Sequence, residues 1–342
     1  MKLILFLCLL CASSLNAAAP DEFDELMGKE TAHWRYVEQT QDKETLDLSK
    51  TLYYKNKNRQ NISIGPFKIP PVVHFIWLGP NAFPPQSVEN VRSWIAQHPG
   101  WKVKFWTDRD REPPCEGMEK VLVQDFNFYK LGKCYEESKN WGEKSDLLRY
   151  EILFQQGGIY VDHDANCLKS FSGMSRGYDF FCGLETPHEA FVGRNVTCGN
   201  GILGARALHP TVGRVIELIA DRWQSLGERF RGNDDYSRIE VVMQRTYIAL
   251  TLAIAETIDR EENVDIILPA AYFFSKSGID PIYSKHFYAS AWDAFKSRKS
   301  EMVHKGEKTL GKIRRKNLNL SYLILGLIVF NSLMLYRAVR FR

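Results

Sequence analysis

The sequence predicts an α/β protein: a mostly parallel β-sheet with flanking helices, followed by a transmembrane helix near the C-terminus. Three observations lead to this fold class. Residues 72–78 form a near-continuous apolar run, as in a strand buried on both faces of a sheet. Strand-like and helix-like segments then alternate, which is typical of a parallel sheet with crossover helices. Residues 318–336 carry no charge and are long enough to cross a bilayer.

The expected elements can be placed in order along the chain. We expect strands at 72–78, 102–106, 121–123, 159–161, 178–184 and 266–269. We expect helices at 86–97, 143–156, 208–226 and 241–256. The second of these should end at Gly157, because a glycine after the last turn commonly terminates a helix. Ligands of parallel sheets bind at the carboxyl ends of strands, so the functional site is expected where strands 72–78 and 159–161 end.

The composition is ordinary for a protein that buries a core. Of the 342 residues, 44% are hydrophobic and 25% are charged, and this length allows one large domain or two small ones. The formal net charge of +4 is too small to argue for a nucleic-acid partner, and none is expected. The cysteines after residue 20 have no zinc-ligand spacing.

Both ends of the chain carry segments that indicate export and a membrane. Residues 1–19 combine a lysine, a short apolar run and an alanine-rich zone, which predicts a signal peptide, with an uncleaved signal anchor as the alternative. A helical extension and linker at 20–66 and a globular domain at 67–296 should follow. A basic juxtamembrane linker at 297–317 then leads to the transmembrane helix at 318–336, for which a buried amphipathic helix is the alternative.

The two ends predict opposite membrane orientations. Basic residues at 312–316 outweigh those after residue 336, which places the globular domain in the cytoplasm by the positive-inside rule. The signal-like N-terminus places it outside. We favour the signal and expect a single-pass membrane protein whose globular domain lies on the exported or lumenal side.

Asp162 and Asp164 are the first candidates for chemistry. They follow the strand expected at 159–161, and alternate residues of a strand point to the same side. Two carboxylates aimed together suit a hard divalent cation such as Mg²⁺ or Mn²⁺, which also binds substrate phosphates. The alternative is an acidic surface turn with solvated charges.

Asp146 and Arg149 lie shortly before this pair, in the helix expected at 143–156. Residues three apart share a face of a helix, so the carboxylate and the guanidinium should be neighbours. Together they could offer an acceptor and a fork of donors to a polar ligand beside the metal. The alternative is a surface ion pair that contributes little to stability.

The pattern around these residues resembles a known family. Residues 145–164 read Ser-Asp-x-x-Arg-Tyr-x-x-Leu-x-x-x-Gly-Gly-Ile-Tyr-x-Asp-x-Asp. This resembles the signature of the sugar transferases with a DXD motif, which include Golgi α-mannosyltransferases, sphingolipid mannosyltransferases and, more distantly, clostridial glucosylating toxins. Residues 69–79 are similar to the family's first strand, and residues 286–292 to its late His…Ser-x-Trp element.

The resemblance implies a GT-A-like, Rossmann-like nucleotide-sugar-binding domain and a role for each matching residue. It implies that Asp162 and Asp164 are catalytic and hold Mn²⁺ or Mg²⁺ as the cofactor. It implies substrate binding by a further set of side chains: Trp77, Asp146, Arg149, Asn200, His286 and Trp292. For Trp77 core packing is an equal alternative, and for Asn200 a role in a turn.

The predicted function is therefore that of an enzyme, a metal-dependent retaining glycosyltransferase. It would move mannose, galactose or glucose from a UDP- or GDP-sugar to a glycolipid, glycan or protein acceptor at a membrane. A metal-dependent phosphohydrolase and a catalytically inactive sugar-binding membrane protein are the alternatives. One departure concerns the acceptor side of the pocket, because the family often has Thr-Gly-Pro where this chain has Arg245-Thr246-Tyr247.

Overall fold

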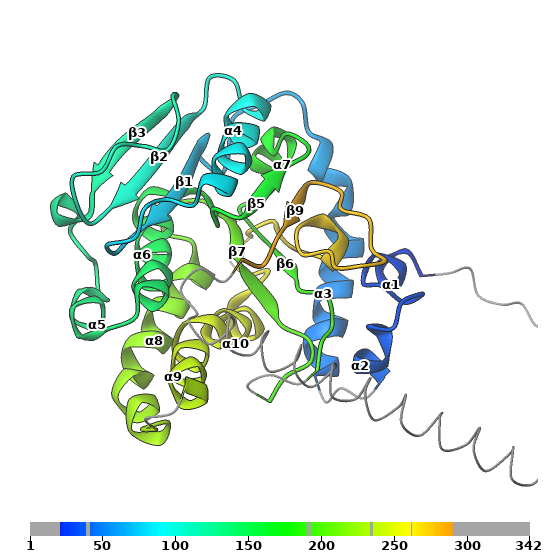
Figure 1. Cartoon of the computed structure of the whole chain (residues 1–342). Helices are drawn as coiled ribbons and strands as arrows, with labels where there is room; N and C mark the ends of the chain where they lie inside the picture. Colours follow the sequence, from blue (N-terminus) through cyan, green and yellow to red (C-terminus); the bar gives the residue numbers. More distant parts are fainter. Residues whose placement is uncertain (1–20, 39–41, 190–192, 233–234, 261, 290–342) are drawn as a thin grey trace, which may run out of the picture. The chain divides into compact units, whose positions relative to one another are not determined.

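The computed structural model describes residues 21–38, 42–189, 193–232, 235–260 and 262–289. The signal peptide, the basic linker and the transmembrane helix that the sequence predicts lie outside these residues. A seven-stranded sheet runs through the described part in the order β3-β2-β1-β4-β7-β6-β8 (Figure 1). Its strands are β1 (Val72–Trp77), β2 (Lys102–Thr107), β3 (Met118–Leu122), β4 (Gly158–Val161), β6 (Phe180–Leu184), β7 (Cys198–Ala205) and β8 (Asp265–Leu268).

The sheet is mostly parallel, in agreement with the α/β class that the sequence predicts. Strand β1 pairs in parallel with β2 and β4, β2 with β3, and β6 with β8. Strand β7 is the exception, because it runs antiparallel to both β4 and β6. A second, two-stranded sheet joins β5 (Ala165–Cys167) to β9 (Ser284–His286), with Ala165 opposite His286.

Helices cover the main sheet on both sides (Figure 1). Helix α6 packs against β1, β4 and β7, and α8 packs against α6 and α10, while α3 packs against β8. The α-helices are α1 (Glu22–Leu26), α2 (Trp34–Glu38), α3 (Lys43–Asn56), α4 (Val88–Gln97), α5 (Gly132–Glu137), α6 (Trp141–Gln156), α7 (Ser172–Gly177), α8 (Pro210–Arg229), α9 (Asp235–Val242) and α10 (Ile248–Thr257). Short helical turns are η1 (Lys57–Asn61), η2 (Pro85–Ser87), η3 (Val123–Asp125), η4 (Met243–Tyr247) and η5 (Ala270–Tyr272).

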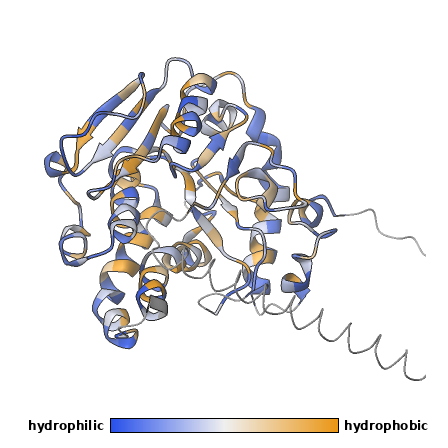
Figure 2. Cartoon of the chain, in the orientation of Figure 1, coloured by the Kyte–Doolittle hydropathy of each residue, from blue (hydrophilic) through white to orange (hydrophobic). Residues whose placement is uncertain are grey.

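Helix α6 shows how the sequence sets the limits of an element near the site. Asn140 caps its first turn by accepting a hydrogen bond from the Glu143 amide at 3.0 Å. Gly157, with φ of 66°, ends it as expected, because few other residues adopt that backbone conformation. Its buried apolar residues, such as Leu147 and Ile152, belong to the core, and Figure 2 shows hydrophobic residues concentrated on the strands and on the inner sides of the helices.

The predicted layout differs from the structure in several places. The strand expected at 121–123 is observed as β3 at Met118–Leu122, and helices α5 and α7 were not predicted. The single helix expected at 241–256 is divided into α9, the π-helical turn η4 and α10. Strands β5, β7 and β9 were not predicted. β5 and β9 have only three residues each, and β7 carries three glycines that read as a turn.

The transmembrane part of the predicted fold class is contradicted by the helices of the structure. Within the described ranges, no helix is both long enough and apolar enough to cross a bilayer. The predicted α/β sheet is therefore correct. The predicted membrane-spanning helix, and the single-pass localisation derived from that helix, are wrong. Both predictions rest on residues 318–336 and the basic residues before them, which lie outside the part of the chain that the structure describes.

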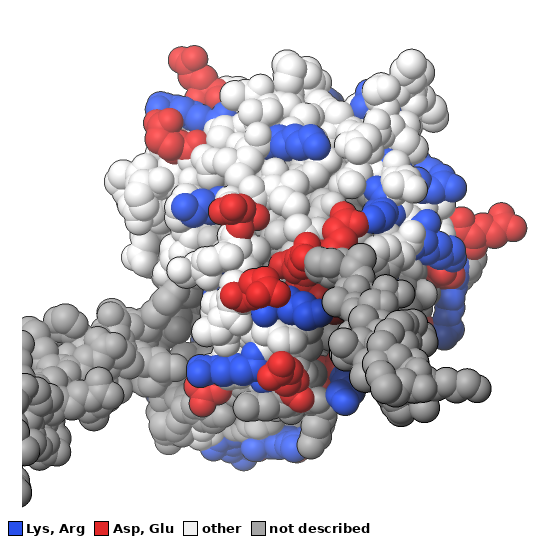
Figure 3. Space-filling view, turned by 90° about the vertical axis from the view of Figure 1, so that its right-hand side faces the viewer, with Lys and Arg blue, Asp and Glu red and all other residues white. Residues whose placement is uncertain are grey.

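Charge on the surface is mixed. On the face drawn in Figure 3, basic and acidic side chains are interspersed, and the described side chains there form no extended patch of one sign. That distribution is consistent with the small net charge of the chain.

His74 is a buried polar residue in the middle of β1, and its two ring nitrogens have different partners. The Trp106 indole donates to Nδ1 at 3.1 Å, so Nδ1 carries no proton. Nε2 therefore carries the proton and donates to the carbonyl of Gly157 at 2.9 Å. Burial lowers the pKa of His74 to about 4, so the ring is neutral in the folded protein at pH 7.

We expect the stability of the protein to fall as the pH drops from about 6.5 to about 4, in part because of His74. In this window the unfolded chain binds a proton at His74 and the folded chain does not, so protonation favours unfolding by up to about 1.4 kcal/mol per pH unit. Urea unfolding at several pH values measures the slope. In His74→Gln, which keeps a donor and an acceptor, the slope should be smaller by about one proton; an unchanged slope would contradict the assignment.

Candidate active site

The candidate site lies where the order of the strands changes direction. From β1 the chain moves outward to β2 and β3 and then returns to β4 on the other side of β1. In open α/β sheets ligands bind at such a point, at the carboxyl ends of the strands. Trp77 ends β1, and Asp162 follows the last residue of β4.

Asp162 and Asp164 lie in a turn, and not in the strand from which their common direction was inferred. Strand β4 ends at Val161, and the turn is closed by a hydrogen bond from the Ala165 amide to the Asp162 carbonyl at 3.2 Å. The Asp162 amide donates to the Gly201 carbonyl of β7 at 2.7 Å, which fixes the start of the turn to the sheet. The two carboxylates nevertheless face a common partner, His286.

Asp162, Asp164 and His286 form a cluster, called here the DDH cluster, that could hold a metal ion. His286 Nε2 lies 3.3 Å from Asp162 Oδ2 and 3.5 Å from Asp164 Oδ1. One ligand atom from each residue lies within 4.8 Å of the other two. The sequence predicted His286 as a substrate-binding residue; the structure places it among the candidate metal ligands.

The space and the chemistry of the DDH cluster fit a divalent cation. A Cβ atom on Gly201 would lie 2.7 Å from Asp162 Oδ2 and 2.9 Å from His286 Nε2, so the glycine keeps the neighbourhood of these atoms open. Two carboxylates and an imidazole are a ligand set that Mn²⁺ accepts, and Mg²⁺ prefers oxygen alone. The set therefore favours Mn²⁺ between the two predicted cations.

The charges around Asp162 stabilise its ionised form. Burial tends to raise the pKa of Asp162, but the charge of Arg149 and hydrogen bonds from His286 and Tyr160 outweigh it, and the pKa lies well below its ordinary value. The Tyr160 hydroxyl donates to Asp162 Oδ1 at 2.6 Å. For His286, burial tends to lower the pKa, but the hydrogen bond to Asp162 and the charge of Asp164 raise it.

Arg149 connects α6, β7 and the DDH cluster. Its Nη2 lies 2.7 Å from Asp146 Oδ1 and 3.4 Å from Asp162 Oδ1, and its Nη1 donates to the Asn200 carbonyl at 2.6 Å. The guanidinium lies 4.0 Å from the centre of the Tyr160 ring. Only 5% of the Arg149 side chain is exposed, so the alternative of a surface ion pair does not apply.

Asp146 is surrounded by donors. Its Oδ1 accepts from Arg149 and, at 3.2 Å, from the side-chain amide of Asn200. Its Oδ2 accepts from Thr246 Oγ1 at 2.5 Å. Burial raises the pKa of Asp146, although the charge of Arg149 opposes the shift. Asp146 and Arg149 are thus neighbours, as the helix spacing predicts, and Asn200 joins them beside Asp162.

The remaining predicted site residues differ in position. Trp77 is half-buried, its Nε1 donates to the Asn81 carbonyl at 2.9 Å, and its ring meets the His163 ring edge to face at 4.9 Å. His163 is turned from the DDH cluster toward Ser87, whose hydroxyl lies 2.8 Å from Nδ1. Trp292 lies outside the described residues.

The resemblance placed residues 286–292 at the site, but no pattern in the sequence indicated the backbone contacts by which this segment holds Asp164. The Phe287 amide donates to the Asp164 carbonyl at 2.9 Å, and the Ala289 amide donates to Asp164 Oδ2 at 2.5 Å. Tyr160 and Thr246 were also missed as partners of the acidic residues. Thr246, Phe287 and Ala289 lie far along the chain from the acidic residues that they contact, so no local pattern could have indicated them. Tyr160 lies only two residues before Asp162, and side chains two apart in an extended segment point to the same side.

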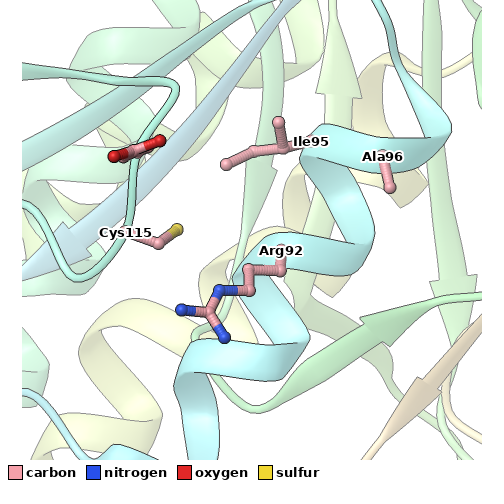
Figure 4. A pocket seen from close by; sticks show the side chains of 5 residues that line it. Arg92, Ile95, Ala96 and Cys115 are labelled. Carbon is pink, nitrogen blue, oxygen red and sulfur yellow. The ribbon is translucent and has the colours of Figure 1, made fainter.

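A pocket elsewhere on the surface contains none of these residues. Figure 4 shows it beside α4, and it is lined by Arg92, Ile95 and Ala96 of the helix and by Cys115 and Glu116. The site described above is therefore defined by its converging polar groups and not by this pocket.

The comparisons with known proteins agree with this geometry. Residues 84–181 match the family model described as the glycosyltransferase sugar-binding region containing a DXD motif. Over these residues the chain is therefore similar to the DXD-motif glycosyltransferases, which confirms the resemblance seen in the sequence. The matched range includes Asp146, Arg149, Asp162 and Asp164.

Individual relatives carry names of the same class. An uncharacterised glycosyltransferase of Acanthamoeba polyphaga mimivirus is 31% identical over 42% of this chain and 52% of its own length. Inositol phosphoceramide mannosyltransferase 3 of Schizosaccharomyces pombe is 28% identical over 43% of this chain and 36% of its own length. The chain thus matches about half or less of these relatives. The PaToxG glycosyltransferase structure superposes with a TM-score of 0.42 at 14% identity, covering 63% of this chain and 78% of its own.

Proposed function

We propose that the protein is a metal-dependent, retaining glycosyltransferase that moves a hexose from a nucleotide-diphosphate sugar to a glycan or glycolipid acceptor. The observation that carries the proposal is the DDH cluster lying beside the buried Arg149–Asp146 pair at the switch point of the sheet. The catalytic domain is proposed to be residues 67–296, of which 290–296 lie outside the described residues.

Within this mechanism each group of residues has a separate task. Asp162, Asp164 and His286 would hold a divalent cation, which supplies positive charge that stabilises the departing nucleoside diphosphate. Arg149 and Asp146 would bind donor hydroxyls, because a guanidinium offers parallel N–H donors and a carboxylate accepts from hydroxyl groups. Trp77, at the end of β1, would contact the base or the ribose with its ring.

The donor and acceptor classes are proposed from the relatives. Two of the relatives are named inositol phosphoceramide mannosyltransferases, and a third is named a mannosyl phosphorylinositol ceramide synthase. Their similarity favours mannose, carried by a guanosine diphosphate, and a glycolipid acceptor among the hexoses and acceptors that the sequence allows. The predicted phosphohydrolase alternative leaves the Arg149, Asp146 and Asn200 assembly without a role.

A donor panel tests the proposal. The protein is incubated with GDP-mannose, UDP-glucose and UDP-galactose, with Mn²⁺, and release of the nucleoside diphosphate is measured. We expect Mn²⁺-dependent release from one donor and its loss in excess EDTA, restored by added Mn²⁺. Activity that survives exhaustive chelation would contradict the metal, and absence of turnover and of donor binding with every sugar nucleotide would contradict the transferase.

A further inference from the structure

The π-helical turn η4 interrupts what the sequence predicts as one continuous helix. It spans Met243–Tyr247 between α9 and α10. Single π-helical turns inside α-helices are rare and frequently occur at functional sites. This turn contacts α6, the helix that carries Asp146 and Arg149.

Thr246 is the residue of this turn that reaches the candidate site. Its side chain is fully buried, and its Oγ1 lies 2.5 Å from Asp146 Oδ2 and 2.9 Å from the Val242 carbonyl. The turn is also joined to α6 through the Tyr150 hydroxyl, which donates to the Thr246 carbonyl at 3.1 Å. Thr246, which lies 100 positions from Asp146 in the chain, is therefore joined to α6 by both its side chain and its backbone carbonyl.

The hydrogen bonds of Asp146 leave it little freedom. An ionised carboxylate has about four acceptor positions on its two oxygens. Arg149 and Asn200 take two positions on Oδ1, and Thr246 takes one on Oδ2. About one acceptor position on Oδ2 is then left for a ligand. The hydrogen bond from the Thr246 hydroxyl fixes the direction of this free position.

We propose that Thr246 is a positioning residue that orients Asp146 toward a hydroxyl of the donor hexose. This proposal rests on the proposed function and assigns the Asp146 end of the site to the sugar, separate from the diphosphate at the DDH cluster. Without the Thr246 hydroxyl, Oδ2 of Asp146 has two open acceptor positions and a carboxylate that can rotate. Recognition of the sugar then weakens, and recognition of the nucleoside diphosphate does not.

The test compares Thr246→Val, which removes the hydroxyl at nearly constant volume, with Thr246→Ser, which keeps it. Thr257→Val is the matched control, because Thr257 Oγ1 likewise lies within hydrogen-bond distance of the carbonyl four residues earlier, that of Ala253 at 2.7 Å, and belongs to the same helical region. For each protein the affinity for the intact sugar nucleotide is divided by the affinity for the nucleoside diphosphate, both with Mn²⁺. Donor kcat/KM and Tm are measured alongside.

We expect Thr246→Val to lower both the ratio of the two affinities and the donor kcat/KM by roughly tenfold to a hundredfold. This factor corresponds to the contribution of a hydrogen bond to a charged group. Thr246→Ser should stay within about threefold of the unmodified protein, and Thr257→Val should leave the ratio unchanged. Equal weakening of both ligands in Thr246→Val, or no weakening, would overturn the proposal. If that variant does not fold, Thr246→Ala replaces it, and an Ala ratio equal to the Ser ratio overturns the proposal. An unmodified protein that binds no sugar nucleotide refutes the proposed function instead.

Discussion

Asp164→Asn is expected to reduce donor turnover by a thousandfold or more and to abolish stabilisation by Mn²⁺, while the fold is kept. The substitution removes one negative charge from the DDH cluster and so weakens metal binding. A bound metal ion stabilises the charge of the transition state by several kcal/mol, which corresponds to a factor of about a thousand in rate. The fold should survive, because the amide oxygen of Asn can still accept the hydrogen bond that the Ala289 amide donates to Asp164 Oδ2.

Two measurements check the Asp164 prediction: donor turnover as Mn²⁺ is titrated, and the shift of Tm with Mn²⁺. Asp179→Asn is the matched control, since Asp179 also accepts a backbone amide, that of Val264 at 2.9 Å, but has no contact with the DDH cluster among the described residues. The control should keep its Mn²⁺ response. Near-normal turnover in Asp164→Asn would show that Asp164 is not a metal ligand.

Arg149→Lys is expected to lower donor kcat/KM by about tenfold to a hundredfold. The guanidinium meets Asp146 and Asp162 with Nη2 and the Asn200 backbone carbonyl with Nη1, and a single ammonium group cannot reproduce this fork. The loss should fall mainly on donor use, since the Arg149 contact with Asp162 is the longest of the three, at 3.4 Å.

Donor kinetics and Mn²⁺ dependence of Arg149→Lys are compared with those of Arg206→Lys. Arg206 is half-buried, and it pairs with Asn263 and the Ala207 carbonyl, away from the site. We expect the control to change donor kcat/KM by less than about threefold. If Arg149→Lys behaves like the control, the helix α6 contributes only structure to the site.

The parts of the fold that could be predicted from the sequence are those with a local pattern. The apolar run of β1 and the helix α6, with its stop at Gly157, were predicted within two residues of their observed limits. The same holds for the position of the acidic pair directly after β4. Periodicity and turn residues are properties of neighbouring positions, so the sequence contains them directly.

The parts that were missed depend on contacts between distant segments. Strand β7 reads as a turn because it carries Gly199, Gly201 and Gly204, yet these glycines make room for other side chains. A Cβ on Gly199 would lie 2.6 Å from the Phe274 ring, and one on Gly204 would lie 2.2 Å from the Phe181 ring. The role of His286 beside the carboxylates likewise follows only from the pairing of β9 with β5, which no local pattern indicates.

The wide separation of the DDH ligands along the chain bears on folding. Asp162 and His286 are 124 positions apart, and His286 reaches the carboxylates only when β9 has paired with β5. Closing so long a loop carries an entropic cost that local contacts do not, and such contacts tend to form late. Tight Mn²⁺ binding would therefore indicate that the whole domain has folded. In a cell with little of the cation, a larger fraction of the chain would be in states in which β9 has not yet paired with β5.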